Sequence, residues 1–253
     1  MAKVMSFSKD GKLITNAADS SYSTTQYDYS YLYETGSSVN STYLKVWYDA
    51  LDSSTTSSVL YDLSGNGNHA TLNNEASINT SGGYVSFDGV NDSITVATDT
   101  DLEFSTTNQC TFEVWVRNPS TSNGSDTYGR IVDYGDTTIT IGSYNNYELR
   151  NWVYAGGSRS SEIRSGSTGY ADDTWHHIFF SYNGSSFIVL VDGVALGSNS
   201  KTGALESGKT LNLAVGDDNY WHGDIAIFRA YNIGFPSEVG KRNFNIERKR
   251  FAV

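Results

Sequence analysis

Residues 178–193 read IFFSYNGSSFIVLVDG, and this stretch decides the fold. Its first part carries bulky apolar or aromatic residues at every second position, Ile178, Phe180 and Tyr182. Successive side chains of a strand point to opposite faces, so these three share one face of a predicted strand. Asn183-Gly184 is a favoured two-residue hairpin turn, and a second apolar run follows at residues 187–191. The stretch therefore predicts a β-hairpin, and Asp192-Gly193 predicts the next turn.

The rest of the chain repeats this pattern of short strands and turns. Strand-like runs occur at residues 43–48, 84–87, 93–96, 110–117, 211–215 and 224–231. In the fourth run Phe112, Val114 and Val116 share one face, and Glu113, Trp115 and Arg117 share the other. The 253 residues include 18 Tyr, 11 Phe and 5 Trp but 2 Pro, and they show no long 3.6-residue periodicity. The sequence therefore predicts an all-β fold, a β-sandwich of the jelly-roll type.

Charge and apolar content exclude several classes of protein. A formal net charge of −11 opposes binding to phosphate backbones, so we expect no nucleic-acid partner. No segment approaches the ~20 apolar residues of a membrane helix, so we expect no membrane insertion. Cys110 is the single cysteine, which excludes an internal disulfide framework and predicts a buried strand thiol. Residues 1–19 contain no apolar run long enough for a signal-peptide core, so we expect a chain made in the cytoplasm.

The composition divides the chain into three segments. Residues 1–42 are rich in Ser, Thr and Tyr and predict an N-terminal arm that packs on a partner or on the main domain; a flexible linker is the alternative. Residues 43–240 hold the predicted sandwich. Pro236 is suited to the first turn of a short helix that ends near Asn243. Residues 241–253 form a basic tail, which either docks an acidic neighbour or is solvated.

Five stretches resemble the motifs of laminin-G-like, concanavalin A-like lectin domains, in the order that this family shows. They are residues 61–70 (YDLSGNGNHA), 85–92 (VSFDGVND), 111–116 (TFEVWV), 174–193 with WHH, YNG and VDG, and 223–232 (GDIAIFRAYN). The resemblance implies a concanavalin A-like β-sandwich. This fold serves lectins, enzymes and purely structural proteins, so it does not decide the function by itself.

The end of the chain carries a narrower resemblance. Residues 238–251 (EVGKRNFNIERKRF) are similar to the ending of such domains in tailed-phage virion proteins. This implies a virion protein made in the host cytoplasm, as a capsid decoration or a tail or fibre component. It would bind other virion subunits within an oligomer or larger assembly and present loops to host-surface polysaccharide. The alternatives are a bacterial carbohydrate-binding module or adhesin and, more remotely, a polysaccharide-degrading enzyme.

The Gly-rich loop at residues 61–70 and the closing strand contain the candidate ligands of a structural Ca²⁺ ion. These are Asp62, Asn66, Asn68 and Asp224. Calcium takes about six to eight oxygen ligands, and such a loop can turn backbone carbonyls inward beside Asp and Asn side chains. Asp224 is included because the resemblance implies that this loop lies near the closing strand. In the alternative interpretation, Asp62 and Asn66 make turn hydrogen bonds without a metal.

Aromatic clusters provide the candidate carbohydrate contacts. Residues 217–222 (DDNYWH), predicted as a loop, offer Trp221, Tyr220, Asp218 and Asn219. A second cluster offers Trp152 and Tyr154. Sugar rings stack on such side chains, while Asp, Asn and backbone groups bind hydroxyls. Protein–protein interfaces are also enriched in Tyr and Trp, so a protein contact is the second interpretation of these clusters. Core packing is a third interpretation, and it is strongest for Trp47, Trp115 and Trp175.

We predict no catalytic residue. Acid–base cleavage of a glycoside needs two positioned carboxylates, and Glu113 stands alone on its strand. His176-His177 cannot chelate one ion, because adjacent strand residues point to opposite faces. The sequence therefore predicts a non-catalytic binding or structural module.

Overall fold

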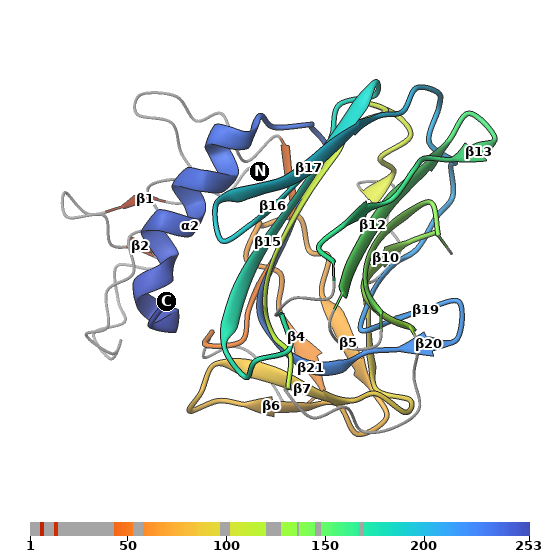
Figure 1. The fold of residues 1–253 in the computed structure, drawn as a ribbon. Helices are drawn as coiled ribbons and strands as arrows, with labels where there is room; N and C mark the ends of the chain where they lie inside the picture. The colour runs from red at the N-terminus through yellow and green to blue at the C-terminus, as the bar shows by residue number, and fades with distance from the viewer. Residues whose placement is uncertain are drawn as a thin grey trace.

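Two large antiparallel sheets pack face to face in the computed structural model (Figure 1). The structure describes residues 6–7, 13–14, 43–52, 58–96, 102–119, 128–135, 137–144, 148–166 and 170–253. The predicted all-β sandwich is therefore confirmed. The proposed arm at residues 1–42 lies outside the described residues except for β1 (Ser6–Phe7) and β2 (Leu13–Ile14), which pair with each other.

The first sheet has eight strands, and its centre is formed by β9 and β21. In order across the sheet, the strands are β17 (Val194–Ser200), β16 (Ser186–Val191), β15 (Trp175–Tyr182), β9 (Cys110–Arg117), β21 (His222–Tyr231), β7 (Tyr84–Asp88) and β6 (Ser77–Asn79). β3 (Leu44–Asp49) pairs with the second half of β21. The predicted hairpin is β15–β16, and Gly184 in its turn has φ +87°.

The second sheet has nine strands. Their order is β13 (Ser158–Arg159), β12 (Glu148–Ala155), β11 (Ile139–Tyr144), β10 (Tyr128–Tyr134), β18 (Leu211–Leu213), β8 (Ser93–Val96), β5 (Ala70–Asn73) and β4 (Val59–Leu60), and β14 (Ile163–Arg164) pairs with β12. A small hairpin, β19 (Val215–Gly216) and β20 (Asn219–Tyr220), leads into β21.

Alternation along β9 creates two separate cores. Phe112, Val114 and Val116 belong to the core between the sheets. Trp115, on the opposite face, belongs to a second core that also contains Trp47, Phe244 and Phe251. The split of strand faces and the burial of Cys110 agree with the sequence expectation.

The C-terminal helix α2 (Ser237–Phe251) covers the outer face of the eight-stranded sheet (Figure 1). Phe251 stacks on Trp115 with ring centroids 4.0 Å apart. Arg250 makes a buried ion pair with Asp49 at 2.6 Å. The short helix expected to end near Asn243 is therefore wrong, because residues 244–251 continue it and carry side chains that bind the sheet. Of the two interpretations of the basic residues, docking on an acidic neighbour applies to Arg250, which pairs with Asp49. No helix in the described ranges has the length and apolar character that crossing a bilayer requires.

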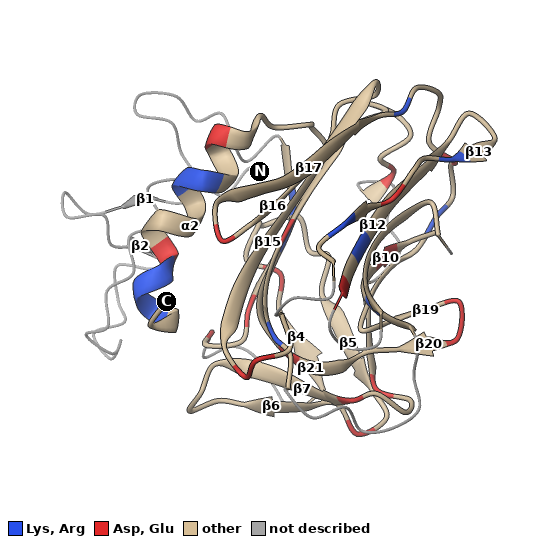
Figure 2. Cartoon of the chain, viewed as in Figure 1, with Lys and Arg blue, Asp and Glu red and all other residues tan. Residues whose placement is uncertain are grey.

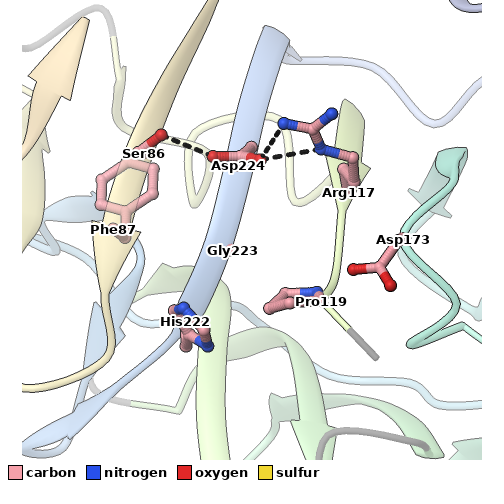
Figure 3. A pocket seen from close by; sticks show the side chains of 8 residues that line it. All are labelled: Ser86, Phe87, Arg117, Pro119, Asp173, His222, Gly223 and Asp224. Atoms are coloured by element: carbon pink, nitrogen blue, oxygen red, sulfur yellow. Dashed lines mark hydrogen bonds and ion pairs between the residues drawn. The ribbon is translucent and has the colours of Figure 1, made fainter. Parts of the chain in front are cut away.

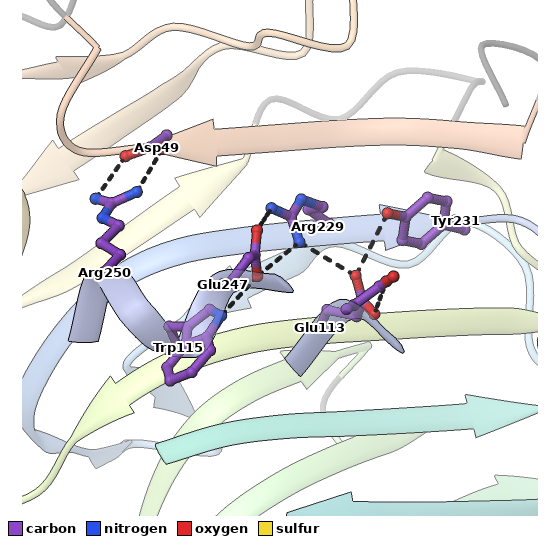
Figure 4. Close-up of polar contacts among 8 residues, drawn as sticks. Asp49, Glu113, Trp115, Arg229, Tyr231, Glu247 and Arg250 are labelled. Carbon is purple, nitrogen blue, oxygen red and sulfur yellow. Dashed lines mark hydrogen bonds and ion pairs between the residues drawn. The ribbon is translucent and has the colours of Figure 1, made fainter. Parts of the chain in front are cut away.

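A buried polar network lies between α2 and the sheet (Figure 4). Glu247 of α2 binds the guanidinium of Arg229, and its Oε2 accepts the Trp115 indole N–H at 2.7 Å. Glu113 accepts from the Asn243 amide at 2.6 Å and lies 3.3 Å from Arg229. Burial raises the pKa of Glu113, although the charge of Arg229 opposes that shift. The network fixes the helix on the sheet, because every member would be costly to leave unpaired.

Candidate functional site

One row of polar and aromatic residues crosses four strands on the outer face of the eight-stranded sheet. Trp175 of β15 pairs with Arg117 of β9, Arg117 with Asp224 of β21, and Asp224 with Ser86 of β7. Val116, the residue before Arg117 on β9, points into the core between the sheets. Adjacent strand residues point to opposite faces, so Arg117 and the rest of the row lie on the outer face, which carries α2. The register of four strands thus assembles a site from residues far apart in sequence.

The row borders a pocket of about 320 Å³, which is within the range of small-molecule sites (Figure 3). Its lining residues are Ser86, Phe87, Arg117, Pro119, Asp173, His222, Gly223 and Asp224. Asp224 lies between two donors: Oδ1 accepts from Ser86 Oγ at 2.6 Å, and Oδ2 accepts from Arg117 Nε and Nη2 at 2.8 and 2.7 Å. The pocket therefore presents an ordered carboxylate and guanidinium.

Two aromatic rings hold the guanidinium in place. The Cζ atom of Arg117 lies 4.9 Å from the ring centroid of Tyr84 and 5.1 Å from that of Trp175. The side chain of Arg117 remains 32% exposed, so solvent or a ligand can reach it. Burial alone would lower the pKa of Arg117, but the hydrogen bonds to Asp224 and the charge of Asp224 raise it. The site can thus donate and accept hydrogen bonds beside partly exposed aromatic carbon.

The expected sugar platform at Trp221 is wrong, because this side chain is 0% exposed. Trp221 packs near Phe87 in the inter-sheet core, with ring centroids 6.2 Å apart. The indole also leaves no room for a side chain at two neighbouring positions, Gly129 and Gly223. A Cβ at Gly129 would lie 2.9 Å from the Trp221 ring, and a Cβ at Gly223 would lie 2.5 Å from it. Trp221 is therefore a core residue behind the pocket floor.

The neighbouring candidates lie on a tight turn away from the pocket lining. Asp217 and Asp218 both have positive φ, 51° and 56°, as a primed hairpin turn between β19 and β20 requires. Asn219 donates from its side chain to the carbonyl of Asp217, and Tyr220 is half-buried on β20. These residues remain candidates for surface contact, but they do not form one site with Asp224.

Trp152, in the second cluster, is 1% exposed, so the expectation of an open stacking platform there is also wrong. Its indole N–H donates to the carbonyl of Thr137 at 3.2 Å. The guanidiniums of Arg130 and Arg159 lie over its ring at 4.6 and 4.7 Å. Tyr154 is half-buried and donates its hydroxyl to the Gly157 carbonyl at 2.9 Å.

In this arrangement the residues expected to bind calcium have hydrogen-bond partners within the protein. Asp62 Oδ1 accepts from the backbone N–H groups of Trp47 and Ser64, and Oδ2 accepts from Ser64 Oγ and the Asn68 N–H. Asn66 and Asn68 donate their side-chain amides to carbonyls of β3. Asp224 is engaged in the pocket instead. Among the described residues, no group of three or more His, Cys, Asp and Glu side chains could hold a metal ion.

Arg117 and Ser86 of the pocket lining, and Trp175 beside Arg117, were missed at the sequence level. Arg117, Trp175 and Ser86 each stand on an expected strand, but their register depends on pairings between strands about 60 to 140 residues apart. One feature of the sequence could have indicated this site: Arg117 is a charged residue on the same strand face as Trp115.

Comparisons with known proteins agree with this fold. The binding domain of Paraclostridial Mosquitocidal Protein 1 superposes with a TM-score of 0.63 at 16% identity, covering 81% of this chain and 52% of that one. The binding domain of botulinum neurotoxin serotype D gives 0.63 at 14% identity, with the same coverage. That of botulinum neurotoxin DC, solved with rat synaptotagmin II, gives 0.64 at 13% identity over 81% and 52%.

At these identities the likeness shows the fold alone, and the chain spans about half the length of these solved structures. No curated protein sequence matches the chain. The model of one family matches residues 87–237, which is more than half of the 253 residues and includes Arg117, Trp175 and Asp224. The chain therefore belongs to the concanavalin A-like lectin/glucanases superfamily.

Proposed function

We propose that this chain is a non-catalytic virion protein whose sandwich binds a host-surface glycan in the pocket beside Arg117 and Asp224. The observation that carries the glycan proposal is the ordered Asp224 carboxylate, held between Ser86 and Arg117 next to the rings of Tyr84 and Trp175. A carboxylate accepts hydrogen bonds from sugar hydroxyls and a guanidinium donates to them, while aromatic carbon contacts the C–H faces of a sugar ring.

The chemistry of the carboxylates supports binding rather than hydrolysis. Both oxygens of Asp224 already accept hydrogen bonds, Oδ1 from Ser86 and Oδ2 from Arg117, which suits a fixed acceptor for ligand hydroxyls. Glu113 and Glu247 are 1% and 4% exposed and are bound within the network under α2. A buried, hydrogen-bonded pair of carboxylates is suited to holding a helix, since a glycosidase needs its two carboxylates at the scissile bond.

The virion assignment depends on the similarity of residues 238–251 to the ending of tailed-phage virion proteins. That segment forms the greater part of α2, so the resemblance concerns a folded and anchored element. In this proposal α2 and the arm at residues 1–42 attach the sandwich to capsid or tail subunits. A bacterial carbohydrate-binding module or adhesin is the second candidate, because the pocket would serve it equally well.

Particle composition separates these candidates. Mass spectrometry of purified particles should find the chain in a fixed ratio to the major capsid protein, and its absence from particles would exclude the virion role. Release of reducing ends from a polysaccharide panel would instead establish an enzyme.

Glycan binding is tested on the pocket itself. Asp224→Asn keeps the shape of the side chain but removes its charge, so retention on host polysaccharide should weaken about tenfold or more. The matched control is Glu75→Gln, a similar change at an exposed turn residue outside the pocket lining. Equal retention of Asp224→Asn and wild type would exclude this pocket as the glycan site.

A further inference from the structure

The charged side chains that line the pocket at Asp224 do not balance one another. Arg117 contributes one positive charge, while Asp224 and Asp173 contribute two negative charges. Arg117 directs Nε and Nη2 to one oxygen of Asp224, at 2.8 and 2.7 Å, so these two charges compensate each other. With His222 neutral, Asp173 therefore gives the described lining an excess of one negative charge.

Asp173 is held at the pocket by the turn that precedes β15. Its backbone N–H donates to the carbonyl of Asn118, the residue after Arg117, at 3.1 Å. Its φ of +65° is a conformation that Asp and Asn adopt more readily than most residues. Asp173 is exposed, and Figure 3 shows its carboxylate on the side of the pocket opposite Ser86. A ligand in the pocket can therefore reach the carboxylate of Asp173 from solvent.

The surroundings of the pocket add to this negative charge. The chain has a net charge of −11, and Figure 2 shows acidic positions in the loops beside β7. Asp88, at the end of β7, is exposed and pairs in register with His222, which lines the pocket. Residues opposite each other on paired strands share a face of the sheet, so Asp88 lies on the face that carries the pocket. Such a field attracts cations and repels acidic sugars.

A sugar that bears an ammonium group fits this distribution of charge. An ammonium group has three hydrogen-bond donors and no acceptor, so a carboxylate is its best partner. We propose that the pocket binds an amino sugar, whose ammonium group pairs with Asp173 while its hydroxyls contact Arg117 and Asp224. The inference rests on the proposed glycan function and names the substrate class of that same site.

Neutral and acidic sugars match the pocket less well. A neutral sugar offers Asp173 a hydroxyl and leaves the excess negative charge without compensation. An acidic sugar adds a further negative charge, because the guanidinium of Arg117 is already bound by Asp224. Since Asp173 is exposed, solvent and salt screen its charge, and the preference for the amino sugar should be moderate.

Calorimetric titration of the intact chain compares two β-1,4-linked tetramers, one of glucosamine and one of glucose, with the matching galactosamine and galactose tetramers as a second pair. The members of a pair differ only at C2, where one carries an ammonium group and the other a hydroxyl. At pH 7 the amino form of at least one pair should bind about fivefold more tightly than the neutral form, and the preference should decline as salt is added. Asp173→Asn keeps the shape of the side chain and should bind the two members within about twofold of each other.

Two further variants separate this inference from the proposed function. Asp224→Asn should weaken binding of both members of a pair, while Glu75→Gln, a change at an exposed turn residue outside the lining, should keep the wild-type preference. Equal binding of the two members by wild type, binding of neither pair, or a preference that survives in Asp173→Asn would overturn the inference, as would equally tight competition by oligolysine. The proposed function would stand in those cases if Asp224→Asn still weakened retention on host polysaccharide. It would fail together with the inference if wild type bound neither the tetramers nor that polysaccharide.

Discussion

Arg229 of β21 and Glu247 of α2 form an ion pair in which the two side chains are 0% and 4% exposed. The pair joins the last strand of the sandwich to the C-terminal helix. Glu113 lies on the other side of Arg229, and Trp115 donates to the same carboxylate of Glu247. Removing one member of a buried pair leaves the other charge without compensation in a low-dielectric environment.

Glu247→Ala should therefore lower the free energy of unfolding by about 3 kcal/mol. This is the lower end of the range for broken buried pairs, because Glu113 still pairs with Arg229 in the variant. Urea denaturation followed by tryptophan fluorescence measures the change. Glu75→Ala, an exposed carboxylate on a turn, should change it by less than about 0.5 kcal/mol. Equal effects of the two variants would show that the network contributes nothing to stability.

Local patterns in the sequence predicted the strands and turns well. The alternation at residues 112–117 separated the two faces of β9 correctly, and Asn183-Gly184 marked the β15–β16 hairpin. Such features depend on neighbouring residues alone. The family motifs from residue 85 to residue 232 lie within or beside the span that the family model matches.

Long-range pairings could not be predicted in the same way. The basic residues of 241–253 indicated a tail, but Phe244, Glu247 and Phe251 recur at helical spacing and find partners on strands β9 and β21. The site at Arg117 and Asp224 depends on strand register, and Trp221 is buried because the short β19–β20 hairpin turns it into the core. Sequence spacing shows which residues share a face of an element, but it does not show which elements that face contacts.

Trp221→Ala should act through stability. Because the indole fills the core between Gly129 and Gly223, its removal should cost about 3–5 kcal/mol. Tyr220→Ala, on the adjacent hairpin strand and half-buried, should cost clearly less. Thermal unfolding monitored by circular dichroism compares the two. A Trp221→Ala protein with a wild-type melting temperature would contradict the buried position.

The two adjacent histidines should respond to pH in opposite directions. His177 is buried between Trp115 and Phe244, with ring centroids at 5.1 and 6.3 Å, and burial lowers its pKa to about 4. In the unfolded chain a histidine titrates near pH 6.5, so between about pH 6.5 and 4 the unfolded state binds more protons. The free energy of unfolding is therefore not reduced by His177 above about pH 6.5, where the residue is neutral in both states. It decreases as the pH falls from about 6.5 toward 4, because only the unfolded state binds the proton. His177→Phe should flatten the decline of the melting temperature over that interval, and an unchanged slope would contradict a neutral His177.

His176 should give the reverse dependence. The imidazole Nδ1 of His176 lies 2.7 Å from an Asp192 oxygen, and Nε2 lies 3.2 Å from an Asp172 oxygen. Burial alone would lower the pKa of His176, but the two carboxylates outweigh that effect and raise it. A group whose pKa is raised by folding adds its full stability below its unfolded pKa, near 6.5, and loses it as the pH rises through the folded value. The difference in unfolding free energy between wild type and His176→Gln should therefore be largest below about pH 6 and should shrink at higher pH. Urea denaturation at pH 5.5, 7 and 8.5 measures it, with His69→Gln as the control because His69 is an exposed histidine. A difference that grows with pH would show that His176 is held neutral, and its ion pairs with Asp172 and Asp192 would then have to be rejected.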